Sequence, residues 1–147
     1  MGSTFSSLHH HIVIGTKNRR PLIKPQWRPQ FHQYLGGAIR GLGAVPQITG
    51  GVEDHVHILI GLNTSIAPAD LVREIKKASS VWASKHHDPE FSWQEGYGIF
   101  SVSWRHCESV REYIANQEEH HRHTNFFEEY RRLLERNGVV YDPKWLK

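Results

Sequence analysis

The most constraining feature of this sequence is a short apolar run that carries two histidines one residue apart. The run from 51 to 61 is rich in β-branched residues and begins and ends in glycine, a pattern typical of a β-strand. Successive side chains of a strand point to opposite faces, so His55 and His57 share one face while Val56 and Ile58 share the other. The fold must therefore bury one face of this strand while the opposite face presents two imidazoles.

Two neutral imidazoles presented side by side form half of a metal site. The histidine pair has a second interpretation, in which both rings are half-buried in the sheet and form ordinary hydrogen bonds. The pair by itself fits both interpretations, and a second group of residues is needed to decide between a metal site and a structural role.

The surrounding elements predict an α+β fold of the ferredoxin-like kind. The residues from 47 to 52 form a strand that pairs with the histidine strand through a tight turn, giving an antiparallel hairpin. The predicted order is β-α-β-β-α-β followed by two further helices. The strands are expected at about 8–16, 47–52, 55–61 and 97–103. Two helices are expected at about 25–42 and 108–121, and two others begin near residues 68 and 125. In such a fold the helices cover one face of the sheet and leave the other face for a ligand or an added helix.

Composition restricts the class of protein. A chain of 147 residues with 38% hydrophobic content is expected to form a single domain over 1–147 with a buried core. The single cysteine excludes an internal disulfide and suits a reducing compartment, and no apolar run reaches the ~20 residues that span a bilayer. We therefore expect a cytoplasmic protein without a membrane partner.

The formal net charge of +3 permits a nucleic-acid partner without requiring one. Two groups of basic residues are candidates for contacts with DNA phosphates, one in the loop after the first strand and one on the second helix. They are Lys17, Arg19 and Arg20, and Arg73, Lys76 and Lys77. Each group also has the simpler interpretation of a solvated surface.

The third predicted helix carries Tyr113 and Gln117 four residues apart, so their side chains share one helical face. Alone this is a weak signal, because a tyrosine at the core margin and a solvent-exposed glutamine would give the same spacing. It gains weight from the histidine pair earlier in the chain.

The chain resembles the single-tyrosine transposases of the HUH nuclease superfamily, which mobilise insertion sequences of the 200/605 type. The resemblance rests on two motifs that occur in this order along the chain, Asp54-His55-Val56-His57 and Tyr113-Ile114-Ala115-Asn116-Gln117. The similarity extends over almost the whole chain and includes the helix at 70–76. The family's fold is the ferredoxin-like one predicted above from the residues alone.

The resemblance implies cleavage and rejoining of single-stranded DNA. His55, His57 and Gln117 would hold one Mg²⁺ or Mn²⁺ ion, and Tyr113 would attack the scissile phosphate to give a 5′-phosphotyrosine. No residue is identified as the general base for Tyr113. The resemblance also implies hairpin ends of the element as the DNA partner. It further implies a homodimer with two composite sites, in which Tyr113 of one chain meets His55 and His57 of the other; domesticated relatives can instead act as monomers with the site within one chain. An uncovered sheet edge favours such pairing.

Other functions fit parts of the pattern. A histidine-triad hydrolase needs a third histidine where this chain has Leu59, and replication initiators and relaxases are usually larger chains. A domesticated relative that processes repeats would have almost the same sequence. A non-catalytic ferredoxin-like nucleic-acid-binding protein would leave the joint presence of Tyr113, Gln117 and the histidine pair unexplained.

Overall fold

The predicted hairpin around the two histidines forms in the structure, a computed structural model that describes residues 2–146. Strand β2 (Val45–Gly51) pairs antiparallel with β3 (His55–Leu62), and Gly50 lies opposite His57. Pro46 lies where the register of β2 shifts, which is one of the few positions in a strand that tolerate proline. The histidines therefore occupy the turn end of the hairpin.

The four strands form one antiparallel sheet in the order β2-β3-β1-β4. Strand β1 (Leu8–Gly15) lies in the centre, between β3 and β4 (Gly98–Val102). This strand order and the sequence of elements confirm the predicted α+β, ferredoxin-like fold.

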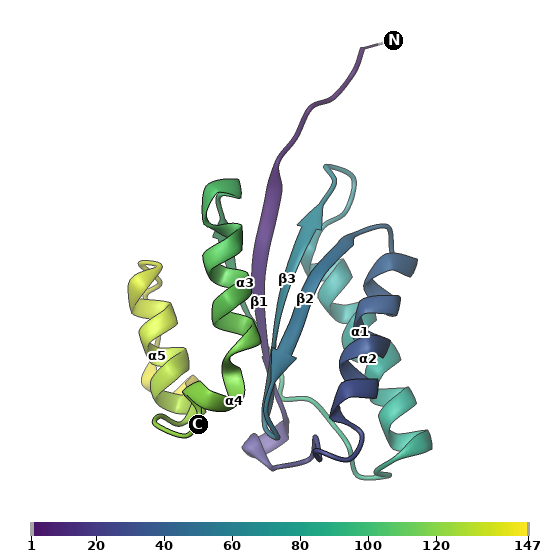
Figure 1. The fold of residues 1–147 in the computed structure, drawn as a ribbon, viewed down its shortest axis with the longest axis vertical. Helices are drawn as coiled ribbons and strands as arrows, with labels where there is room; N and C mark the ends of the chain where they lie inside the picture. Colours follow the sequence, from purple (N-terminus) through teal and green to yellow (C-terminus); the bar gives the residue numbers. More distant parts are fainter. Residues whose placement is uncertain (1, 147) are drawn as a thin grey trace.

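Two helices cover one face of the sheet (Figure 1), namely α1 (Arg28–Gly41) and α2 (Pro68–His86). Phe31, Leu35 and Ile39 of α1 are fully buried and belong to the same core as Val56 and Ile58 of β3. The helical stripe and the even-numbered side chains of β3 thus face each other, as their periodicities predict.

The opposite face of the sheet is covered by the C-terminal helices (Figure 1). These are α3 (Cys107–Ala115), α4 (Gln117–His120) and α5 (Phe126–Arg136), and short 3₁₀ helices η1 (Lys17–Arg19), η2 (Trp104–His106) and η3 (Pro143–Leu146) complete the chain. The predicted continuous helix at 108–121 is wrong in one respect, because Asn116 adopts φ −97° and ψ 21° and separates α3 from α4. The helix is therefore interrupted between Tyr113 and Gln117.

Gly50 permits the close approach of α3 to the sheet. A Cβ atom at this position would lie 2.3 Å from the carbonyl oxygen of Ile114, closer than real side-chain atoms come to backbone. Any other residue would push α3 away from the hairpin, so Gly50 sets how near the residues of α3 come to β3. Among the described helices, none is both long and apolar enough to cross a lipid bilayer.

Candidate functional site

His55 and His57 lie side by side on the face of the sheet that α3, α4 and α5 cover. Both side chains are fully buried, and their ring centroids are 5.0 Å apart. The strand period brings the two rings together, as predicted, while Val56 between them points into the core beneath α1 and α2.

Each of these histidines has its Nδ1 atom engaged by a neighbouring side chain. His55 Nδ1 lies 2.7 Å from Asp54 Oδ1, and His57 Nδ1 lies 2.8 Å from His11 Nε2. Metal-binding histidines are held in this way, with one ring nitrogen fixed by a polar partner and the other directed at the ion. The Nε2 atoms of both rings are consequently turned toward one shared point.

Tyr113 and Gln117 reach the same point from the helical layer. Gln117 is 1% exposed, and its Oε1 atom lies 3.1 Å from His55 Nε2. The ring of Tyr113 lies 5.7 Å from that of His57, centroid to centroid. One chain thus contains the whole predicted group, and no exchange of the tyrosine helix between subunits is needed to bring it together.

Two further residues belong to this group and were not predicted, Glu129 and His121. Glu129 is 2% exposed, and its Oε1 atom lies 3.0 Å from His57 Nε2, 3.1 Å from His55 Nε2 and 2.9 Å from His121 Nε2. The Tyr113 hydroxyl donates a hydrogen bond to the other carboxylate oxygen, Oε2. A sequence signal for Glu129 exists, because it falls on the buried stripe of α5 between Phe126 and Leu133.

The converging atoms fit a divalent cation. One ligand atom from each of His55, His57, His121 and Glu129 lies within 4.8 Å of the others. Ligands at right angles around an ion with bonds of about 2.1 Å are about 3 Å apart, which matches the separations between Glu129 and the imidazoles. Imidazole nitrogens combined with carboxylate and amide oxygens suit Mn²⁺ and related ions, without selecting one of them.

The electrostatics of the group favour a buried negative charge at Glu129. Burial alone would raise the pKa of this carboxyl group, but hydrogen bonds from His121, His55 and His57 hold it far below its ordinary value. Burial lowers the pKa of His57 to about 4, whereas for His55 the hydrogen bonds to Asp54 and Glu129 outweigh burial and raise the pKa to about 9. The carboxylate is therefore charged and is balanced by an imidazolium.

Tyr113 is a protonated phenol in this environment. Burial raises the pKa of its hydroxyl group, and the negative charge of Glu129 raises it further. A cation close to the phenol oxygen would act in the opposite direction, since a positive charge favours the ionised form.

The first predicted group of basic residues lies close to the histidines. Lys17, Arg19 and Arg20 follow β1, whose end is tied to the hairpin by a 2.9 Å hydrogen bond from Thr16 N to Asp54 O. The Arg19 guanidinium lies 5.4 Å from the centroid of the Phe126 ring, which in turn stacks on His55 at 4.0 Å. One aromatic ring thus separates this cation from the site.

The second predicted group, on α2, lies behind the sheet from the histidines (Figure 1). Lys76 Nζ donates hydrogen bonds of 2.7 and 3.2 Å to the carbonyl oxygens of Gln94 and Gly96, and Arg73 pairs with Asp70 at 3.0 Å. Lys77 is exposed on the same helix. The structure therefore does not bring Arg73, Lys76 and Lys77 together with the site residues.

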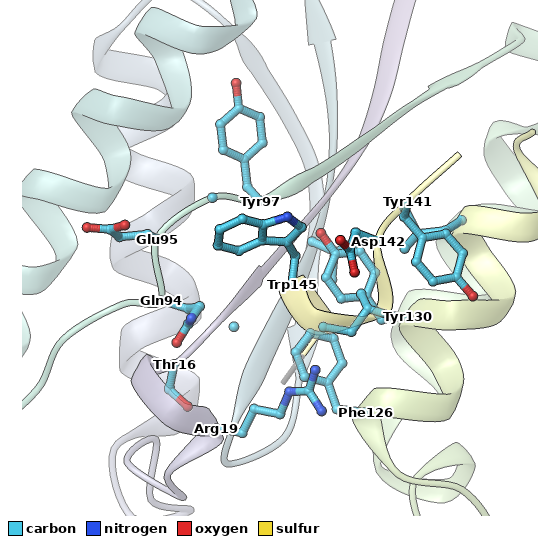
Figure 2. Close-up of a pocket in the computed structure, with 15 residues that line it drawn as sticks. Thr16, Arg19, Gln94, Glu95, Tyr97, Phe126, Tyr130, Tyr141, Asp142 and Trp145 are labelled. Atoms are coloured by element: carbon cyan, nitrogen blue, oxygen red, sulfur yellow. The ribbon is translucent and has the colours of Figure 1, made fainter. Parts of the chain in front are cut away.

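A cavity of about 440 Å³ has Phe126 in its lining (Figure 2). Aromatic side chains form much of its lining, with Arg19 at one end and Trp145 of η3 near its centre in the view. Because Phe126 lines the cavity and also stacks on His55, one ring forms the wall between the cavity and the histidines.

Comparison with known proteins relates the chain to transposases. A family model described as "Transposase IS200 like" matches residues 4–117. A crystal structure of a protein proposed to be a transposase, from Deinococcus radiodurans R1, is 21% identical with a TM-score of 0.65 and aligns over 80% of this chain and 95% of its own. No curated protein sequence matches this chain.

A second solved structure, a REP-associated tyrosine transposase bound to a REP hairpin, is 15% identical with a TM-score of 0.57 and aligns over 79% of this chain and 72% of its own. At these identities the two structures show a shared fold. Tyr113 and Gln117 lie inside the residues that the family model matches, whereas His121 and Glu129 lie beyond them.

Proposed function

The chain belongs to the IS200-like transposase family, and from this premise we propose that it cleaves and rejoins single-stranded DNA with Tyr113 as the nucleophile. The observation that carries the proposal is the meeting of a tyrosine hydroxyl with a buried group of metal-ligating side chains in one chain. Tyr113 hydrogen-bonds to Glu129, whose other oxygen lies 3.0 Å from His57 Nε2. A nucleophile beside a cation site is what phosphoryl transfer to a side chain requires.

His55, His57 and Gln117 would hold the divalent cation, which we propose to be Mg²⁺ or Mn²⁺. A cation bound there polarises the phosphate and stabilises the negative charge that develops on its oxygens. The partners of Nδ1, Asp54 and His11, keep the two imidazoles oriented with Nε2 toward the ion.

The phenol oxygen of Tyr113 forms a bond to phosphorus while the bond from phosphorus to the 3′ oxygen breaks. The phenol loses its proton and the 3′ oxygen gains one, so the 3′ end leaves as a free hydroxyl and the 5′ end remains on the protein as a phosphotyrosine. No net hydrolysis occurs, so attack by another 3′-hydroxyl reverses the step and rejoins DNA without ATP. In a cell this exchange would mobilise an insertion sequence.

The proposed partner is single-stranded DNA with hairpin ends, and a homodimer remains our expectation. The basic loop at 17–20 lies at the same end of the sheet as the histidines and would contact phosphates near the cleaved bond. The related structure named above holds a REP hairpin, which supports this kind of DNA as the first substrate to try.

The deciding experiment is capture of the covalent intermediate. The protein is incubated with a 5′-labelled and a 3′-labelled oligonucleotide that carry the ends of an element, in the presence of Mn²⁺, and the products are separated under denaturing conditions. We expect a protein adduct with the wild type and none with Tyr113→Phe, which removes one oxygen and preserves the packing. Tyr97→Phe, at an exposed tyrosine, is the matched control and should form the adduct normally.

An adduct that persists in Tyr113→Phe, or that maps to another tyrosine by mass spectrometry, would show the assignment of the nucleophile to be wrong. DNA binding without any adduct in the wild type would favour the non-catalytic nucleic-acid-binding protein.

A further inference from the structure

We propose that Glu129 of α5 is a ligand of the cation and also positions Tyr113, so that α5 is part of the catalytic centre. This inference rests on the proposed function, because it concerns the same cation. It adds a residue that neither the sequence pattern nor the family match, which ends at residue 117, includes.

The first argument is the location of Oε1. This atom is within 3.1 Å of Nε2 in His55, His57 and His121, which is the spacing of neighbouring ligands around one ion. His121 is held like the other two, because its Nδ1 atom lies 3.0 Å from the carbonyl oxygen of Thr124 and its Nε2 atom faces Glu129. Three imidazoles that present Nε2 to one carboxylate oxygen form an arrangement of metal ligands.

The second argument is burial. A carboxylate that is 2% exposed is costly to keep ionised unless cations or several hydrogen bonds compensate. The polar partners of the Glu129 carboxylate are the Tyr113 hydroxyl, the Gln117 amide and the imidazoles of His55, His57 and His121, with the His120 imidazole at 3.4 Å. The position therefore serves the site, since an apolar residue would serve the packing of α5 without this cost.

The third argument is the role of Oε2. This oxygen accepts hydrogen bonds from the Tyr113 hydroxyl and, at 2.9 Å, from Gln117 Nε2. One carboxylate thus connects the nucleophile to the cation side of the site through its two oxygens. With a cation held there, this connection would keep the phenol oxygen at a set distance from it, and an in-line attack on a bound phosphate depends on that distance.

Helix α5 is built to hold this carboxylate in place. The Asn125 side chain caps its N-terminus by accepting a hydrogen bond of 2.9 Å from Glu128 N. Phe126 stacks on His55, and Leu133 belongs to a buried cluster with Val13 of β1. Glu128, one residue earlier, points away and pairs with Arg131 at 2.8 Å, which makes it a matched control for loss of one charge on α5.

The test measures binding of Mn²⁺ alone to the full chain without DNA, by isothermal titration calorimetry. We expect Glu129→Gln to weaken Mn²⁺ binding by at least about 10-fold, His57→Ala to weaken it at least as much, and Glu128→Gln to change it by less than about 2-fold. Glu129→Asp retains a carboxylate and should recover part of the affinity that Glu129→Gln loses. Circular dichroism of each metal-free variant establishes that it is folded.

The variants separate failure of this inference from failure of the proposed function. If His57→Ala weakens binding while Glu129→Gln binds Mn²⁺ like the wild type, Glu129 is not a ligand and the metal site itself stands. If neither variant weakens binding, the metal assignment is wrong and this inference is wrong with it.

A measurement on the wild type alone covers the case in which Glu129→Gln does not fold. Hydrogen exchange of the α5 amides is compared in Mn²⁺ and in EDTA. A ligand on α5 ties the helix to β3 through the ion, so we expect slower exchange over residues 127–136 with Mn²⁺. Equal exchange in the two conditions would overturn the inference.

Discussion

His11 Nε2 lies 2.8 Å from His57 Nδ1, and this contact joins two central strands on the face that carries the site. His11 is 4% exposed, and burial, followed by the proximity of His57, lowers its pKa to about 3. A neutral imidazole can accept the Nδ1 proton of His57, which leaves Nε2 of His57 for the cation. The histidine cluster near the N-terminus therefore includes a residue that supports the site.

We predict that His11→Ala weakens Mn²⁺ binding by about 10- to 100-fold, the range seen when the partner of a metal-binding histidine is removed. Titration calorimetry on the metal-free protein measures the effect. His9→Ala is the control, because His9 lies on the same strand and is hydrogen-bonded to Ser7 outside the site. Unchanged affinity in His11→Ala would mean that packing alone orients His57.

Gly50→Ala should destabilise the protein by about 1–3 kcal/mol, because the added methyl group would meet the Ile114 carbonyl oxygen at 2.3 Å and move α3. Urea unfolding measures the change. Gly37→Ala in α1 is the opposite case, since open space surrounds that position and alanine favours a helix by about 0.5–1 kcal/mol. A Gly50→Ala protein as stable as the wild type would show that α3 adjusts without cost.

Mixing Tyr113→Phe with His57→Ala should not restore cleavage. Tyr113 lies 5.7 Å from His57 of its own chain, so every site in a mixed dimer would lack one of the two residues. The adduct assay on subunits exchanged by mild denaturation and refolding tests this. Recovery of an adduct in the mixture would support the exchanged arrangement that the family resemblance allows.

His32 on α1 should make the protein less stable at mildly acidic pH. Burial, together with the nearby Arg28, lowers its pKa to about 4, below the ordinary 6.5. Between these values the unfolded chain binds more protons than the folded one, so stability falls as the pH falls from 7 to 5, with a contribution of about 2 kcal/mol from this group. Urea unfolding at both pH values should show a smaller loss in His32→Gln than in the wild type.

The exposed His86, replaced by glutamine, is the control for His32 and should retain the wild-type pH dependence. An equal loss of stability in His32→Gln and the wild type would contradict the assignment to His32.

Lys17→Gln should weaken binding of single-stranded DNA and reduce the slope of log K against log salt by about 0.7, the value for one phosphate contact to a single strand. Lys17 is exposed in the loop next to the site end of the hairpin. Lys77→Gln removes the same charge from the far side of the sheet and should change the slope little. Equal effects of the two substitutions on fluorescence-anisotropy titrations would mean that DNA also crosses α2.

The residues that sequence alone could identify are those related by local periodicity. His55 and His57 are two apart on a strand, so spacing alone assigns them to a common face. Tyr113 and Gln117 are four apart, and spacing predicts a common face for them too. In the structure they meet across the break at Asn116 and not along one continuous helix. The same kind of spacing places Phe31, Leu35 and Ile39 on one face of α1, which is buried in the structure.

The remaining residues depend on contacts that no local pattern encodes. His11 reaches His57 only because of the register in which β1 pairs with β3, where Val13 lies opposite His57. Glu129 and His121 reach the site because the chain changes direction at Asn116 and again in the turn before α5. The packing of these helices on the sheet sets both changes of direction. The available sequence signal was a glutamate on the apolar stripe of α5. Its role can be assigned only when the side chains that face it in the fold are known.

Mutations on the two faces of β3 have different consequences for the protein. A large-to-small substitution at Val56 or Ile58 leaves a cavity in the core and destabilises the fold, whereas a substitution at His55 or His57 acts on the opposite face. A replacement that keeps a hydrogen bond to the buried Glu129 carboxylate can therefore leave a folded protein that has lost the proposed cation site. In a series of gene copies that accumulate mutations, the site would then be lost at a different rate from the fold. A folded descendant with an altered histidine face could acquire a different function.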